Sequence, residues 1–157
     1  MTYVDFAKRI LDECHRLYPQ DDSKAITFFR EVIVAVEKAN ERRPGSDYWP
    51  SPNPVERGID LIDRNGIGPM IQVKVTQNVR WTPCSSKSSN ISEKALVSLE
   101  IDPNAEWFWV RMAGGQITRC IITPAASLVG ASNRNGNPFT SIGEKDLMSL
   151  PKAESYS

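Results

Sequence analysis

The stretch VERGIDLIDRNGIGPMIQVKVTQ, which runs from Val55 to Gln77, decides how this chain is expected to fold. It contains two short apolar runs, Ile59–Ile62 and Met70–Val75, on either side of a glycine-containing turn. Short apolar runs bounded by turn residues are typical of two strands joined as a hairpin. The stretch therefore predicts a pair of neighbouring strands near the middle of the chain.

Three polar residues interrupt these two strands at positions that share one face. Side chains alternate between the two faces of a strand, so Asp60 points away from its apolar neighbours, and Gln72 and Lys74 do the same on the second strand. Aspartate is disfavoured inside strands, and Asp60 stands between two apolar residues. The pattern predicts that Asp60, Gln72 and Lys74 converge on one side of the sheet, although an exposed polar face on an edge hairpin would alternate in the same way.

Length and composition indicate an ordinary globular chain. With 157 residues, 40% of them hydrophobic and 24% charged, the sequence can bury a core and is not of the disordered class. No apolar run approaches the roughly 20 residues of a membrane span, and the first residues have no signal-peptide pattern. Three cysteines without CxxC spacing favour neither a disulfide framework nor a zinc site, so we expect a cytoplasmic protein.

The remaining elements surround the hairpin on both sides. Apolar periodicity predicts helices over residues 2–18, 24–41 and 91–99 and a last short helix over 143–150, while Glu106–Met112 and Gln116–Thr123 read as strands joined across Gly114 and Gly115. The strand Glu106–Met112 is apolar on both faces, which places it centrally with Trp107 and Trp109 in the core. The prediction is one α/β (α+β) domain over residues 1–157, with a mixed sheet of about four strands flanked by helices.

The hairpin motif resembles the PD-(D/E)xK nuclease signature in the Gln-x-Lys variant of Mrr-like restriction endonucleases. Asp60 matches the aspartate of that signature, and Gln72-Val-Lys74 matches its second half twelve residues later. Together with the element order, the resemblance covers about residues 24–124, leaving an N-terminal helix (1–20) and a C-terminal loop and short helix (125–157). It implies a restriction-endonuclease-like core and a magnesium-dependent endonuclease that hydrolyses DNA phosphodiester bonds.

The resemblance also implies a role for each motif residue. Asp60, the Gln72 amide oxygen and the Val73 backbone carbonyl would hold Mg²⁺ or Mn²⁺, which prefer oxygen ligands. Lys74 would stabilise the charge that develops on the scissile phosphate and aid deprotonation of the attacking water. Gln72 stands where many members have an acid, and Glu31 on the preceding helix is the first candidate to supply one. The other candidates are Asp47, Glu56 and Asp63, of which Asp63 is expected to belong to the turn.

The loop over 78–90 is the predicted contact with DNA. Net charge is zero over the whole chain, but residues 64–134 contain eight basic and four acidic side chains. Hydroxyl and basic groups suit phosphate oxygens, which selects Arg80, Ser85, Ser86 and Lys87. A solvated connection explains the same composition, and Tyr48 and Trp49 can likewise either cap the core or contact a base.

Three functional interpretations stay open. One is the endonuclease, with a homodimer expected because one such domain cuts one strand. The second is a non-catalytic module on the same fold that binds nucleic acid or protein. The third is a small α+β interaction domain with no relation to nucleases. No Walker-type loop or GxGxxG motif occurs, so no nucleotide cofactor is expected.

Overall fold

The computed structural model describes residues 1–17, 19–20, 24–51, 60–82, 90–114 and 116–156. The chain forms two compact units. The first combines Met1–Pro50 with Asp63–Gly68, and the second combines Ser51–Ile62 with Pro69–Ser157. No helix among the described residues has both the length and the apolar character that a membrane span requires.

The first unit is built on two helices, as the apolar periodicity predicts. Helix α1 (Tyr3–Leu17) packs against α2 (Lys24–Arg42), and Ala7 and Ala39 are fully buried, which lets helices approach closely. The strand β1 (Tyr48–Pro50) follows α2. Trp49 packs its ring against those of Tyr3 and Phe6, at centroid distances of 5.2 and 6.3 Å. The aromatic pair Tyr48–Trp49 therefore packs within this unit, as one of its two interpretations predicts.

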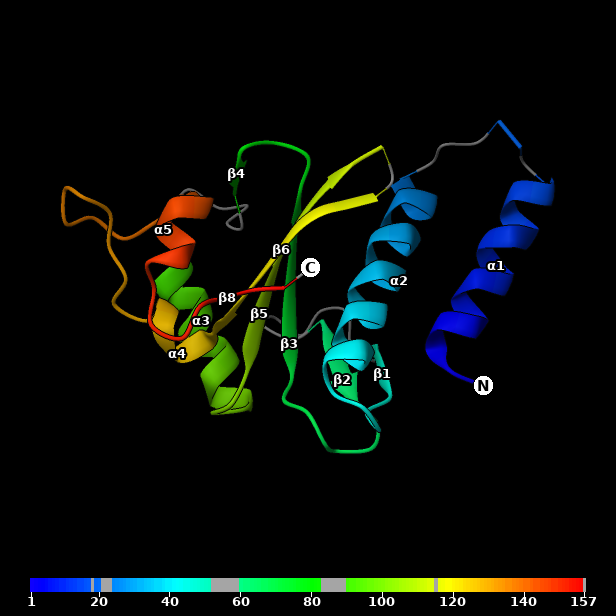
Figure 1. The fold of residues 1–157 in the computed structure, drawn as a ribbon, viewed down its shortest axis with the longest axis horizontal. Helices are drawn as coiled ribbons and strands as arrows, with labels where there is room; N and C mark the ends of the chain where they lie inside the picture. Colours follow the sequence, from blue (N-terminus) through cyan, green and yellow to red (C-terminus); the bar gives the residue numbers. More distant parts are fainter. Residues whose placement is uncertain (18, 21–23, 52–59, 83–89, 115, 157) are drawn as a thin grey trace. The chain divides into compact units, whose positions relative to one another are not determined.

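The strands of the second unit make up most of one mixed sheet (Figure 1). They are β2 (Leu61–Asp63, whose last residue belongs to the first unit), β3 (Ile71–Thr76), β5 (Glu106–Ala113), β6 (Gln116–Pro124) and β8 (Glu154–Ser155). Strand β3 pairs antiparallel with β2 and parallel with β5, and β6 pairs antiparallel with β5 and β8. Among the described residues the full order is β1-β2-β3-β5-β6-β8, a mixed sheet of six strands. The predicted hairpin and the mixed α/β class are confirmed.

One face of this sheet carries the largest core. Helices α3 (Ile91–Ile101), α4 (Ala125–Leu128) and α5 (Glu144–Met148) lie on the same side (Figure 1), together with the small ribbon of β4 (Arg80–Trp81) and β7 (Ile142–Gly143). Helix α3 begins after Asn90, whose side-chain oxygen accepts a hydrogen bond of 3.0 Å from the Glu93 N–H. Trp81, Trp107 and Trp109 fill the space beneath these elements, so the predicted burial of Trp107 and Trp109 is confirmed.

The prediction of about four strands is wrong, because the described residues contain additional short ones. Strands β1, β4, β7 and β8 are only two or three residues long, and each lies in a segment for which no strand is predicted. Residues 143–150, for example, form the end of β7 and then α5. Such strands carry no readable alternation and are held by partners far away in the sequence, as Ile121 holds Ser155.

Candidate functional site

Asp60 lies at a bend directly before β2, one residue outside the strand in which it was predicted. Its backbone N–H donates to the Ile71 carbonyl (2.9 Å), which anchors it beside β3. Its carboxylate oxygen Oδ2 accepts a hydrogen bond of 2.7 Å from the Val73 N–H. The side chain thus occupies the place where the carbonyl of a longer β2 would pair with β3.

The surroundings of Asp60 oppose its negative charge. Burial raises the pKa of this carboxyl, and the Val73 N–H and the positive charge of Lys74 lower it by less, so its pKa lies above the ordinary value. A carboxylate that is costly to ionise gains from a cation placed beside it. Lys74 directly follows Val73, whose N–H binds the Asp60 carboxylate.

Gln72 directly precedes Val73, whose N–H binds the Asp60 carboxylate, and brings an amide to β3. The residue is 8% exposed, and its side-chain oxygen Oε1 is buried without a hydrogen-bond partner in the described part of the chain. A buried unpaired acceptor costs roughly 1–3 kcal/mol. An oxygen of this kind needs a donor or a cation.

Lys74 extends over the aromatic core from the same face. In the parallel pairing of β3 with β5, Gln72 lies beside Trp107 and Lys74 beside Trp109. The Lys74 ammonium is 5.7 Å from the centre of the Trp107 ring, a distance at which a cation is attracted to the ring face. The ammonium therefore lies over the ring of Trp107.

These groups together fit a hard divalent cation with oxygen ligands. Asp60 supplies a carboxylate and Gln72 an unpaired amide oxygen. The Val73 carbonyl faces the same strand edge as the Val73 N–H that Asp60 accepts, because both groups of a strand residue point the same way. Among the described residues, no group of three or more His, Cys, Asp and Glu side chains is placed to hold a metal. A cation here would depend on the amide and the backbone oxygen.

Asp63 is a turn residue and not a further ligand of this site. Oδ1 accepts from the N–H groups of Asp47 and Asn65, each at 2.9 Å, and Oδ2 accepts from those of Ile67 and Gly68 at 2.8 and 2.7 Å. Burial acts to raise the pKa of Asp63, but the four N–H groups outweigh it, and the pKa is lowered. The expectation that Asp63 belongs to the turn is confirmed.

The other candidate acids are not brought to Asp60 within the second unit. Asp47 lies in the first unit, where its side chain accepts from the Trp49 indole N–H at 3.2 Å. Glu31 is on α2 of the same unit, and burial raises its pKa. Glu56 lies outside the described residues.

Of the predicted DNA-contacting residues, Arg80 is described, while Ser85, Ser86 and Lys87 lie outside the described part of the chain. Arg80 begins β4 and is exposed. Next to it lies Arg111, which the sequence reasoning did not select. The signal for Arg111 was present, because it is the only charged residue on the Trp107–Trp109 face of a strand predicted to be central.

Comparisons with known proteins give no relative: no protein-family model and no curated protein matches this chain.

Proposed function

We propose that this chain is a metal-dependent endonuclease that hydrolyses DNA phosphodiester bonds at Asp60, Gln72 and Lys74. The observation that carries the proposal is the pairing of a carboxylate that is costly to ionise with a buried amide oxygen that has no partner. Both groups gain from a cation, and a lysine lies close enough to influence the acid. Hydrolysis of a phosphate ester with a metal ion requires oxygen ligands for the cation and a positive group for the phosphate, and these three residues can supply both.

The order of elements supports a restriction-endonuclease-like core. Apart from the short strands β1 and β4, a helix precedes the strand next to Asp60, the strand with Gln72 and Lys74 is its antiparallel neighbour, and a helix and further strands follow. This is the order that the resemblance to the PD-(D/E)xK nucleases implies. It supports the fold proposal independently of the three motif residues.

Each group has a defined role in the proposed reaction. Asp60, the Gln72 oxygen and the Val73 carbonyl would hold Mg²⁺ or Mn²⁺. A divalent cation, when bound, supplies a water of lowered pKa and polarises a phosphoryl oxygen. The Lys74 ammonium donates hydrogen bonds to the phosphate oxygens on which negative charge develops. Its contact with the Trp107 ring holds it in position before the substrate arrives.

Nicking of a supercoiled plasmid with Mg²⁺ or Mn²⁺ tests the proposal. We expect Asp60→Ala and Lys74→Ala to lower the rate at least about 100-fold, the smaller end of what a positioned acid–base group contributes. Asp12→Ala and Lys145→Ala remove exposed charges of the same kind and serve as matched controls. Circular dichroism establishes that each variant is folded. Cleavage at the wild-type rate by a folded Asp60→Ala variant would refute the assignment.

A second candidate is a non-catalytic binding module on the same fold. It is favoured by the single carboxylate of the site, since an amide replaces the second acid. Calorimetric titration with Mn²⁺ separates the two candidates. The nuclease requires binding that Asp60→Ala abolishes, whereas the binding module predicts none that depends on Asp60. Light scattering during size-exclusion chromatography then tests the expected homodimer.

A further inference from the structure

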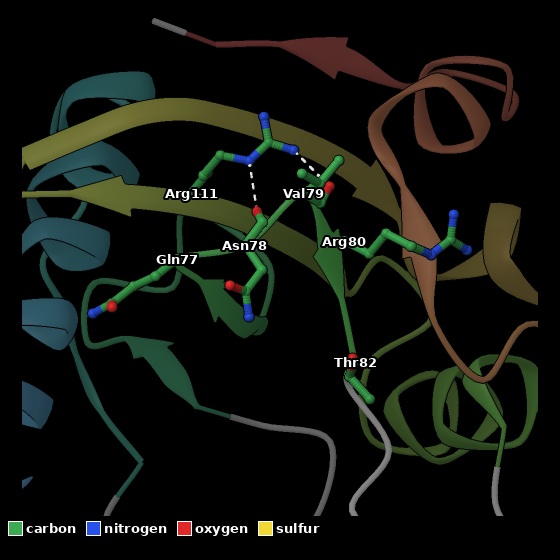
Figure 2. Close-up of a pocket in the computed structure, with 6 residues that line it drawn as sticks. All are labelled: Gln77, Asn78, Val79, Arg80, Thr82 and Arg111. Atoms are coloured by element: carbon green, nitrogen blue, oxygen red, sulfur yellow. Dashed lines mark hydrogen bonds between the residues drawn. The ribbon is translucent and has the colours of Figure 1, made fainter.

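The turn from β3 to β4 forms an open pocket in the second unit. Figure 2 shows its lining, which consists of Gln77, Asn78, Val79, Arg80, Thr82 and Arg111. Its volume is about 670 Å³, within the usual range for sites that hold a small molecule or a nucleotide-sized group. Thr76 fixes the turn, because its hydroxyl donates to the Arg80 carbonyl (2.9 Å) and accepts from the Asn78 N–H (3.0 Å).

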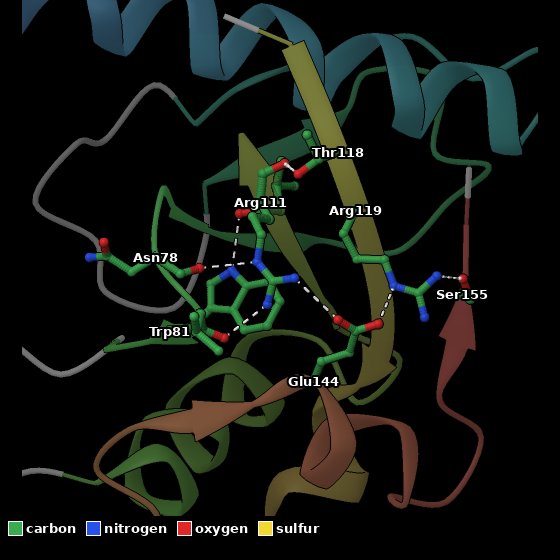
Figure 3. Close-up of polar contacts among 9 residues, drawn as sticks. Asn78, Trp81, Arg111, Thr118, Arg119, Glu144 and Ser155 are labelled. Carbon is green, nitrogen blue, oxygen red and sulfur yellow. Dashed lines mark hydrogen bonds and ion pairs between the residues drawn. The ribbon is translucent and has the colours of Figure 1, made fainter. Parts of the chain in front are cut away.

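Arg111 forms a rigid wall of this pocket. Its Nε and Nη2 donate to the carbonyls of Asn78 (3.0 Å) and Val79 (2.8 Å), and its guanidinium lies 4.9 Å from the centre of the Trp81 ring. Figure 3 shows that Glu144 pairs with Arg111 at 3.1 Å and also with Arg119 at 2.7 Å. One carboxylate therefore faces two guanidinium groups, and this cluster keeps a positive charge.

Arg80 brings a second guanidinium to the pocket, and the carboxylate of Asp146 lies near it, since both would be within 4.0 Å of a Cβ placed on Gly143. Ser141 orients its guanidinium, with Nε 3.2 Å from the hydroxyl oxygen and Nη2 3.0 Å from the carbonyl oxygen. Gly143 leaves room for it, since a Cβ at this position would lie 3.2 Å from Nη1. Within the described part of the chain, no acidic side chain forms an ion pair with Arg80. An oriented arginine without an acidic partner is prepared to receive an anion.

The pocket lies on the same sheet face as the candidate metal site. In the register of β3 with β5, Thr76 lies beside Arg111, on the face that also carries Gln72 and Lys74. From Lys74 to Gln77 the chain advances three residues, which is about 10 Å at roughly 3.3 Å for each strand residue. The two sites are thus close enough to contact neighbouring parts of one DNA strand.

We infer that this pocket binds a backbone phosphate of DNA close to the phosphate that lies at Lys74. Arg80 makes the contact, Arg111 shapes the wall, and the side chains of Gln77 and Thr82 supply further polar groups. The assignment rests on the proposed function, because it takes the substrate strand as the ligand. It adds a phosphate-binding site whose role is to position the DNA and not to cut it.

Salt-dependent DNA binding tests this inference. The probe is a fluorescein-labelled 20-base-pair duplex, titrated in EDTA at several NaCl concentrations and followed by anisotropy. We expect Arg80→Ala to weaken binding and to lower the slope of log K against log[NaCl] by about 0.9, the value for one phosphate contact. Arg80→Lys should keep the slope, because it keeps the charge. Arg134→Ala removes an exposed arginine elsewhere and should leave both quantities unchanged.

The outcomes separate this site from the proposed chemistry. If Arg80→Ala binds the duplex with wild-type affinity and slope, the phosphate site is refuted, whether or not the plasmid is nicked. The inference is also overturned if Arg134→Ala lowers the slope equally or if the wild-type chain does not bind the duplex. If the slope falls only for Arg80→Ala while the wild-type chain nicks nothing, the phosphate site stands and the nuclease proposal fails.

Discussion

The carboxylate of Asp60 accepts the backbone N–H of Val73 at 2.7 Å, so an acidic side chain pairs with β3 where β2 has already ended. This hydrogen bond fixes the acid at the edge of the strand that carries Gln72 and Lys74. It also places the acid among groups that exclude water, and its pKa rises for that reason. Burial of the ionised Asp60 carboxylate therefore lowers the stability of the fold, and the stability should depend on pH for this reason.

Replacing Asp60 by asparagine should stabilise the chain at neutral pH. The folded-state pKa of Asp60 is raised, so the wild-type chain is stabilised by protonation of Asp60 below the ordinary pKa of about 3.9. This contribution to the free energy of unfolding is lost as the pH rises through the folded-state pKa. Asparagine keeps an oxygen for the Val73 N–H and carries no charge. The measurement is the melting temperature of wild type and Asp60→Asn between pH 4 and 8. A difference that shrinks as the pH rises would contradict the assignment.

Replacing Asp63 by asparagine should have the opposite dependence on pH. The folded-state pKa of Asp63 is lowered, so its contribution is present above the ordinary pKa and is lost as the pH falls through the folded-state value. At pH 7 the variant should lose about 1–3 kcal/mol, because an amide nitrogen would face N–H donors. Urea unfolding at pH 7 and pH 3 measures the loss, which should be smaller at pH 3. An equal loss at both values would mean that charge has no part in it.

Converting Gln72 to glutamate should strengthen metal binding. The substitution places a second carboxylate beside Asp60, and hard cations bind more tightly as the ligand charge increases. We expect at least about a tenfold lower dissociation constant for Mg²⁺, equivalent to about 1.4 kcal/mol. Without metal the variant should melt at a lower temperature than wild type, because two acids then repel each other. Gln116→Glu, on the exposed part of β6, is the calorimetric control, and equal Mg²⁺ affinity in both variants would exclude Gln72 as a ligand.

The indole of Trp109 should show strong coupling to Thr123. Its Nε1 donates to the Thr123 hydroxyl at 3.0 Å, and both residues are fully buried. Thr123→Val leaves the indole N–H unpaired and should cost about 1–3 kcal/mol. In a double-mutant cycle with Trp109→Phe the two losses should not add, because the second substitution removes the donor that the first left unpaired. Additive losses would show that the hydrogen bond contributes nothing to stability.

The sequence was sufficient for elements whose pattern is long and local. Alternation over Met70–Val75 predicted β3, and the apolar faces of Glu106–Met112 predicted both the central place of β5 and the burial of Trp107. Asn90 directly precedes α3 and accepts the capping hydrogen bond from the Glu93 N–H. In each case the deciding residues are neighbours in the chain.

What escaped prediction depends on partners distant in the sequence. Strand β4 exists because Arg80 and Trp81 pair with β7, about sixty residues later, and no sequence pattern near Arg80 predicts that pairing. Arg111 reaches Glu144 for the same reason. Asp60 was expected inside a strand, yet it ends outside β2 because its side chain, and not its backbone, completes the contact with Val73. Patterns among neighbouring residues do not predict contacts of this kind.

The parallel pairing of β3 with β5 also has a consequence for the order of folding. Parallel neighbours cannot be joined by a tight turn, so the chain must first form the whole crossover through α3 before Gln72 lies beside Trp107. Closing a long segment costs entropy before any contact compensates for it, which makes such pairings slow. The β2–β3 hairpin can form early from local contacts, but Lys74 gains its aromatic support only when the crossover closes. The candidate site is therefore completed late, and a chain that stops at the hairpin stage holds the motif residues without the geometry that they need.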